Sequence, residues 1–163
     1  MKRFFLIILF FALSAQSEDS MELLEDYWAK EKNTTSVGQL YIAIRCGALY
    51  QQMLTLPPLQ ENLSDDLKVL FELNGYDYYF AAMKSFYETF PHIGKYEGYG
   101  SDPKEEFTDY FSNMLDGVLS KYNEEMTKNF LNSGDFINEF IVRDIYFCND
   151  QIYDARESNW LEK

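Results

Sequence analysis

Apolar residues recur every three or four positions between Asn33 and Ile152, and this spacing constrains the fold more than any other feature. An α-helix completes a turn in about 3.6 residues, so such spacing gathers apolar side chains on one helical face. A spacing of two, which is typical of strands, is not the pattern of this region. The sequence therefore predicts an all-α fold.

The lengths of the periodic segments predict a bundle of about four main helices, preceded by a short one. The short helix is expected over 20–30, and the main helices over 36–55, 64–90, 103–131 and 137–152. The domain organisation that follows is a signal peptide over 1–17, an acidic segment over 18–33, a single bundle domain over 34–155 and a C-terminal tail over 156–163.

Capping residues and prolines set the predicted helix boundaries. Ser36 is expected to cap the first main helix, and the prolines at 57–58 to end it. Asp102–Pro103 has the pattern of an N-cap followed by a proline in the first turn. Asn74–Gly75 leaves two alternatives: the helix ends and restarts there, or it carries the glycine at a cost of about 1 kcal/mol.

The N-terminal segment has the layout of a secretory signal peptide. Lys2 and Arg3 precede the apolar run Phe4–Leu13, and small residues follow before the first acids. The run is about half of the ~20 residues that a membrane span needs. We expect cleavage after Ala15 or Ser17, and a mature chain that is periplasmic or secreted.

Two cysteines, Cys46 and Cys148, remain after this cleavage. An even number of cysteines in an oxidising compartment is most simply explained by a disulfide. The bridge would tie the first main helix to the last one. The alternative is a reactive thiol, which oxidises outside the cytosol unless it is protected.

The chain is acidic, with 27 Asp and Glu against 14 Lys and Arg and a net charge of −13. Such a charge repels phosphate backbones and anionic lipid surfaces, so nucleic acid is not expected as a partner. A basic protein is electrostatically permitted. We expect no membrane span after signal cleavage.

Catalytic and metal-binding motifs are not found. The sequence contains no nucleophile elbow, zinc-protease motif, phosphate-binding loop or calcium-binding loop. His92 is the only histidine, which excludes sites built from several histidines. The clustered acidic residues of the sequence are typical of solvated helix faces. No metal and no cofactor is therefore predicted.

Arg45, Tyr50 and Asp144 form one candidate binding site. Asp144 lies on the inward stripe of the last helix, where a carboxylate must be paired or neutralised. The proposed bridge would bring Arg45 next to it, with Tyr50 nearby. These residues either line a ligand pocket with acid–base character or form a structural ion pair completed by Gln52 and tyrosine hydroxyls, and the second interpretation is favoured.

The glycine-rich loop over 91–101 is the second candidate. His92, Tyr96 and Tyr99 mix aromatic and polar character there, and rigid aromatic rings suit recognition. The alternative, which we favour, is a plain connection whose tyrosines cover the end of the bundle.

These observations favour an exported protein that acts by binding either a protein partner or a small apolar ligand. One alternative is an enzyme that uses carboxylates and tyrosines around Asp144 or the His92 loop. A second alternative is a structural component of the cell envelope.

Overall fold

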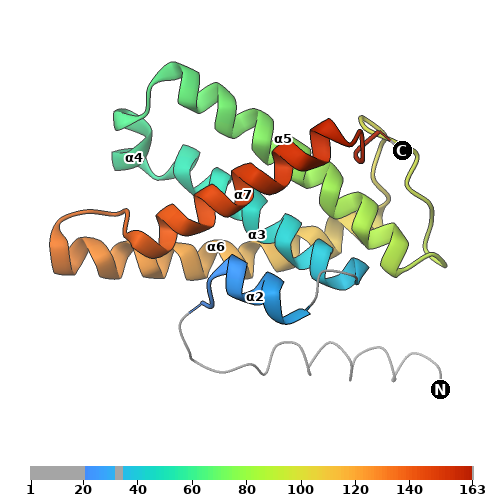
Figure 1. Ribbon diagram of the computed structural model, residues 1–163, viewed down its shortest axis with the longest axis horizontal. Coiled ribbons are helices and arrows are strands. Elements are labelled where there is room, and N and C mark those ends of the chain that lie inside the picture. Colours follow the sequence, from blue (N-terminus) through green and yellow to red (C-terminus); the bar gives the residue numbers. More distant parts are fainter. Residues whose placement is uncertain (1–20, 32–34, 163) are drawn as a thin grey trace.

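The computed structural model describes residues 21–31 and 35–162, and within these ranges the chain is helical without strands. The helices run in the order α2 (Leu24–Glu31), α3 (Ser36–Thr55), α4 (Pro57–Asn62), α5 (Asp65–Thr89), α6 (Glu105–Ser133) and α7 (Glu139–Glu157) (Figure 1). The predicted all-α bundle with one disulfide is confirmed. The signal peptide expected over 1–17 lies outside the described residues.

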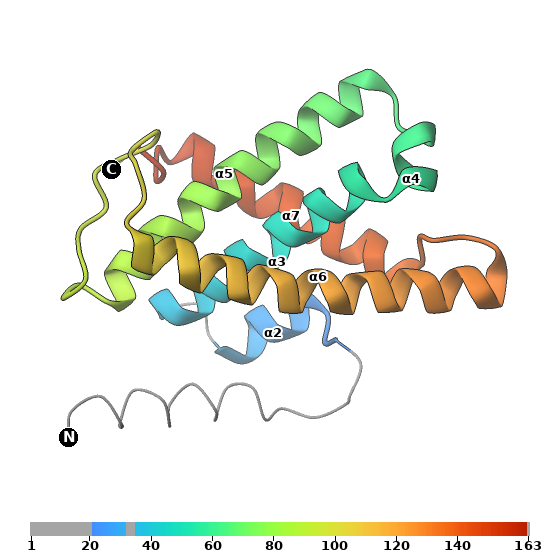
Figure 2. The same cartoon turned by 180° about the vertical axis from the view of Figure 1, so that it is seen from behind.

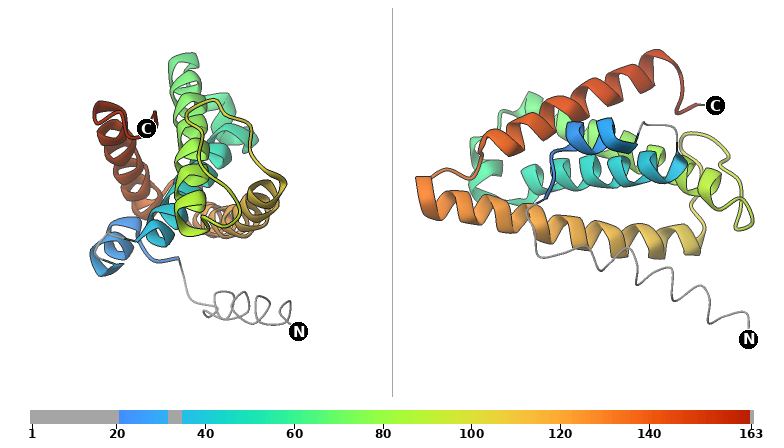
Figure 3. Two further views of the ribbon diagram at one scale, coloured as in Figure 1. Left: turned by 90° about the vertical axis from the view of Figure 1, so that its right-hand side faces the viewer. Right: turned by 60° about the horizontal axis from the view of Figure 1, so that its bottom comes forward.

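Helix α3 occupies the centre of the bundle. It packs against α2, α4, α5, α6 and α7, and its contact with α5 is the most extensive in the molecule. The end-on view in Figure 3 shows α2, α7, α5 and α6 arranged around it, and Figure 2 shows α6 along the side opposite to α7. This position explains why α3 is apolar on nearly all of its faces.

Two predicted caps are wrong by one or more positions. The N-cap of α3 is Thr35 rather than Ser36, because the Thr35 hydroxyl accepts the Gly38 N–H at 3.2 Å. Helix α6 begins at Glu105, so Asp102–Pro103 lies outside it. A tertiary contact lies at its start: the N–H of the N-cap residue, Lys104, donates to the hydroxyl of Tyr87 at 3.0 Å.

Two other segments are more ordered than expected. The prolines at 57–58 end α3 as predicted, and they also open the short helix α4, because proline suits the first turn of a helix. Helix α7 continues to Glu157, and the segment over 158–162 then folds back on the bundle. There the backbone oxygens of Trp160 and Leu161 accept hydrogen bonds from Lys84 and Tyr96, both at 2.8 Å.

Helix α5 runs without interruption through Asn74–Gly75, so of the two alternatives the structure has the helix that carries the glycine. The reason is close packing against α3. A Cβ atom at Gly75 would lie 3.8 Å from Cβ of Tyr50, and one at Gly47 would lie 3.7 Å from Cβ of Tyr78. These glycines let the two helices approach each other.

Replacing Gly75 with alanine is expected to stabilise the protein by about 0.5–1 kcal/mol, because 3.8 Å is an ordinary contact and alanine is the better helix former. Urea unfolding followed by circular dichroism measures the change. Gly100→Ala is the matched control. Gly100 has φ 84° and open space around it, so alanine there is expected to destabilise. Destabilisation by Gly75→Ala would show that the α3–α5 contact has no room for a methyl group.

In the part of the chain that the structure describes, no helix combines the length and the apolar character needed to cross a membrane.

Candidate binding site

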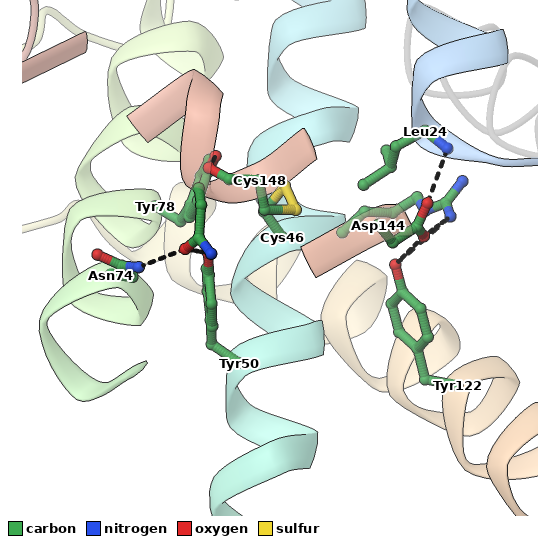
Figure 4. Close-up of a disulfide and its surroundings, with 10 residues drawn as sticks. Leu24, Cys46, Tyr50, Asn74, Tyr78, Tyr122, Asp144 and Cys148 are labelled. Carbon is green, nitrogen blue, oxygen red and sulfur yellow. Dashed lines mark hydrogen bonds and ion pairs between the residues drawn. A yellow bond between two sulfur atoms is a disulfide. The ribbon is translucent and has the colours of Figure 1, made fainter. Parts of the chain in front are cut away.

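Arg45 of α3 and Asp144 of α7 form a buried ion pair, with 2.5 Å between Nη2 of Arg45 and Oδ2 of Asp144. Both side chains are almost completely buried. Tyr122 of α6 donates its hydroxyl hydrogen to the same Asp144 oxygen at 2.7 Å. Three helices therefore meet at one carboxylate (Figure 4).

The same cluster anchors α2. Oδ1 of Asp144 accepts the backbone N–H of Leu24 at 2.9 Å, and Nη1 of Arg45 donates to the backbone oxygen of Glu22 at 2.6 Å. Leu24 is the first residue of α2, so Asp144 acts as its N-cap from another helix and complements the positive end of the helix dipole. The helix therefore begins at Leu24, four residues later than the predicted start at Ser20, which lies outside the described residues.

The electrostatics of this cluster favour a structural role. Burial lowers the pKa of Arg45, but the neighbouring Tyr122 and Asp144 outweigh it, and the net shift is upward. Burial raises the pKa of Tyr122, so its hydroxyl stays protonated and keeps donating to Asp144. Besides bonding to each other, the two charged side chains bond to Glu22, Leu24 and Tyr122, and they line neither of the two cavities described below. This geometry favours a buried ion pair over an acid–base site.

The disulfide predicted between Cys46 and Cys148 is present, and both residues are fully buried. It joins α3 to α7 one helical turn away from the ion pair, because Cys148 follows Asp144 by four residues. In Figure 4 the bridge lies between the ion pair and a second group of polar side chains.

The structure places Tyr50 in that second group, not beside Arg45 and Asp144 as expected. Its hydroxyl donates to Oδ1 of Asn149 at 2.6 Å, and the side-chain amide of Asn74 donates to the same oxygen at 3.1 Å. Gln52 also lies away from the ion pair and bonds to Asn123 at 3.4 Å. Tyr50 follows Cys46 by one helical turn, and its ring lies on the α5 side of α3, where it contacts aromatic rings of α5.

The fully buried Tyr50 and the half-buried Tyr96 make the stability of the protein fall at alkaline pH. Burial raises the pKa of Tyr50 from 10.0 to about 12, and it raises the pKa of Tyr96 to about 12 as well. The folded state therefore holds these protons more tightly than the unfolded chain does. We expect the free energy of unfolding to be retained below about pH 10 and to fall as the pH rises through about 12.

Urea unfolding between about pH 9 and pH 12 measures this effect. Tyr50→Phe removes one titrating hydroxyl, so the variant is expected to lose stability less steeply over this range than the native protein. A free energy of unfolding that stays constant from pH 10 to pH 12 would contradict the assignment, as would equal slopes in the two proteins.

The loop over 91–101 does not gather its three candidate residues into one surface. Tyr96 donates to the Leu161 backbone oxygen, and Tyr99 donates to Oδ1 of Asp77 at 2.6 Å. His92 is exposed, and its ring contacts that of Phe90. The two tyrosines therefore attach the loop to the bundle, which supports the interpretation of a connection that covers one end.

Tyr99 belongs to a polar cluster that sequence reasoning missed. Arg156 donates from Nε to Oδ2 of Asp77 at 2.6 Å, and from Nη2 to Oδ1 of Asn74 at 2.8 Å. A cavity of about 200 Å³ adjoins Asp77, Tyr99 and Arg156. Arg156 was assigned to a tail, although its position four residues after Ile152 continues the inward stripe of α7 and could have indicated the contact.

A larger, apolar groove of about 470 Å³ lies between α3, α5 and α6. Gly47 and Gly75 lie where α3 and α5 approach each other, and they leave the groove without side chains at that point. The remaining apolar lining comes from all three helices and is mainly aromatic: Leu54, Phe71, Tyr76, Tyr79, Phe111 and Leu115. The polar residues that line it are Gln51, Thr55 and Glu72.

The groove continues onto an exposed apolar face of α5. Val69, Leu73 and Tyr76, here called the α5 stripe, follow one another at intervals of four and three and therefore share one face. Each is 54% exposed. Tyr76 belongs both to this stripe and to the lining of the groove, so the two surfaces are continuous. Leu67 and Leu70 add further exposed apolar area on the same helix.

The described residues contain no group of three or more His, Cys, Asp or Glu side chains placed to hold a metal ion. Comparison with known proteins finds no family model, no curated protein and no solved structure that matches this chain.

Proposed function

We propose that the protein acts by binding, and that the groove between α3, α5 and α6 receives an apolar group of a protein partner. The observation that carries this proposal is the aromatic groove of about 470 Å³ that opens onto the α5 stripe. Its volume lies in the range of roughly 300–1,000 Å³ that is typical of ligand sites. Glu72 is the one carboxylate in its lining, so the groove suits binding better than acid–base catalysis.

The α5 stripe favours a protein partner over a small molecule. A small apolar ligand would fill the groove and leave Val69 and Leu73 in contact with water. Contiguous exposed apolar side chains are typical of protein–protein interaction sites, since burying them provides the main driving force for association. The small apolar ligand remains the second candidate, supported by the volume of the groove.

We also propose that the protein works in the periplasm or outside the cell. The disulfide between Cys46 and Cys148 supports this location, because disulfides persist in oxidising compartments and are rare in the cytosol. The charged, apolar and small residues over 1–17 support it independently.

The neutral dye Nile red tests whether the groove takes an apolar group. We expect saturable binding with enhanced fluorescence. Thr55→Trp places a ring in the groove from an exposed position at the end of α3, so it is expected to weaken dye binding about tenfold or more. Val142→Trp makes a similar change at an exposed site on α7 and is expected to bind the dye like the native protein. No saturable binding, or equal loss in both variants, would contradict the proposal.

A further inference from the structure

We infer that the segment which docks in the groove is a cationic amphipathic helix of a basic protein partner. This inference rests on the proposed binding function and adds the chemistry of the partner.

Acidic residues dominate the two helices that form the outer walls of the groove. Residues 65–79 of α5 contain four acids and one lysine, and residues 105–120 of α6 contain four acids and no lysine or arginine. One of the α5 acids, Asp77, is buried and paired with Arg156, which leaves Asp65, Asp66 and Glu72 on that helix. Nζ of the lysine, Lys68, lies 3.6 Å from Oδ1 of Asp65, so Asp65 offsets part of the positive charge of Lys68. The groove is therefore an apolar surface in a negative field, and such a field attracts and orients cationic partners.

The spacing of charges along α5 matches one face of a helical partner. Asp65, Val69, Glu72 and Tyr76 follow one another at intervals of four, three and four, so acidic and apolar side chains alternate along a single line. Glu72 lies at the groove itself. A helix with apolar residues at intervals of three and four and cations beside them would place its apolar face on the groove and the α5 stripe, and its cations near Asp65 and Glu72.

The same charges disfavour other occupants. A second copy of the chain would bring two molecules of net charge −13 together at their acidic walls. Fatty acids and anionic lipids would bring a further negative charge to a groove that Glu72 lines. Like charges placed opposite each other in an interface cost affinity and so exclude partners.

Two synthetic helical peptides test the inference. Both carry leucine along one face, and the opposite face carries lysine in the first peptide and glutamate in the second. Binding is measured by isothermal titration calorimetry with the full folded protein. We expect the leucine–lysine peptide to bind one to one and the leucine–glutamate peptide not to bind. Thr55→Trp is expected to abolish binding of the first peptide, because its ring occupies the groove.

A pair of charge reversals distinguishes binding that depends on the carboxylate at the groove from binding that depends only on the overall negative charge of the protein. Glu72→Lys and Asp150→Lys change the net charge equally, but Glu72 lines the groove whereas Asp150 is an exposed residue of α7. We expect Glu72→Lys to weaken the leucine–lysine peptide about tenfold and Asp150→Lys to weaken it less than about threefold. Circular dichroism checks that both variants are folded.

Equal losses in the two charge reversals, or binding of both peptides, would overturn the inference, because the acids would then not select the partner. Binding of Nile red without binding of the leucine–lysine peptide would overturn the inference and leave the proposed groove function intact. If neither probe binds, both proposals fail.

Discussion

Asp144→Ala is expected to lower the free energy of unfolding by about 3–5 kcal/mol, because it leaves the fully buried guanidinium of Arg45 without its counter-charge. The variant also removes the acceptor for the hydroxyl of Tyr122 and for the first N–H of α2. Urea unfolding followed by circular dichroism measures the loss. Relative to the native protein, hydrogen exchange in the variant is expected to speed up more in α2 than in α5.

Two variants serve as controls for this prediction. The double variant Arg45→Met with Asp144→Leu removes both charges, so it is expected to be more stable than Asp144→Ala alone. Arg143→Ala breaks the partly exposed ion pair with Glu25 and is expected to cost no more than about 1 kcal/mol. A loss below about 1 kcal/mol in Asp144→Ala would contradict the assignment of this pair as the link between α2, α3, α6 and α7.

Removing the disulfide is expected to have a similar effect. The bridge closes a loop between residues 102 positions apart, and in the chain-entropy model such a loop contributes roughly 4–5 kcal/mol. The double variant Cys46→Ala with Cys148→Ala is therefore expected to unfold at a much lower urea concentration. The free energy of unfolding is also expected to fall more steeply with urea concentration, because the unfolded chain becomes less compact.

Thiol labelling provides the second readout for the bridge. Both cysteines are fully buried, so we expect no alkylation of the native protein and complete alkylation after reduction in denaturant. Intact mass spectrometry counts the labels. A labelled thiol in the native protein, or an unfolding midpoint that is unchanged in the double variant, would contradict the role given to the bridge.

The sequence was sufficient to predict the contacts that follow from helical periodicity. The apolar stripe of α7 places Asp144 one turn before Cys148, and the expectation of an oxidising compartment predicted that Cys148 pairs with Cys46. Arg45 precedes Cys46 directly, so the pairing of the two cysteines also indicated the ion pair. The structure has both contacts. These predictions depend on spacing along the chain and on one covalent link.

Contacts that depend on the rotation of one helix against another could not be predicted in this way. Tyr50 is one turn from Cys46 and was expected beside Asp144, but in the structure its hydroxyl bonds to Asn149. Its position depends on how α3 is rotated about its axis, which a helix that is apolar on both faces leaves undetermined. Likewise, α6 starts at Glu105 and not next to Asp102, and the bond between the Lys104 N–H and Tyr87 at this start joins two helices, so spacing along the chain does not indicate it.

The groove could not be predicted from the sequence, for a related physical reason. Tyr76 and Leu73 have the spacing of core residues, so the pattern alone assigns them to the interior. They are exposed because α6 packs on the second half of α5, where the Tyr79 ring contacts those of Phe107 and Phe111. The place where α5 and α6 separate depends on the angle between them, which apolar periodicity does not encode.

Methyl NMR of the leucine-labelled protein, titrated with indole as a neutral aromatic probe, tests most directly whether the groove is a binding site. Leu54 and Leu115 line the groove, whereas Leu49 is fully buried in the core. We predict saturable shifts of the Leu54 and Leu115 methyl signals, little change at Leu49, and loss of these shifts in Thr55→Trp. Shifts confined to leucines outside the groove, or no saturable shift at any leucine, would contradict the account.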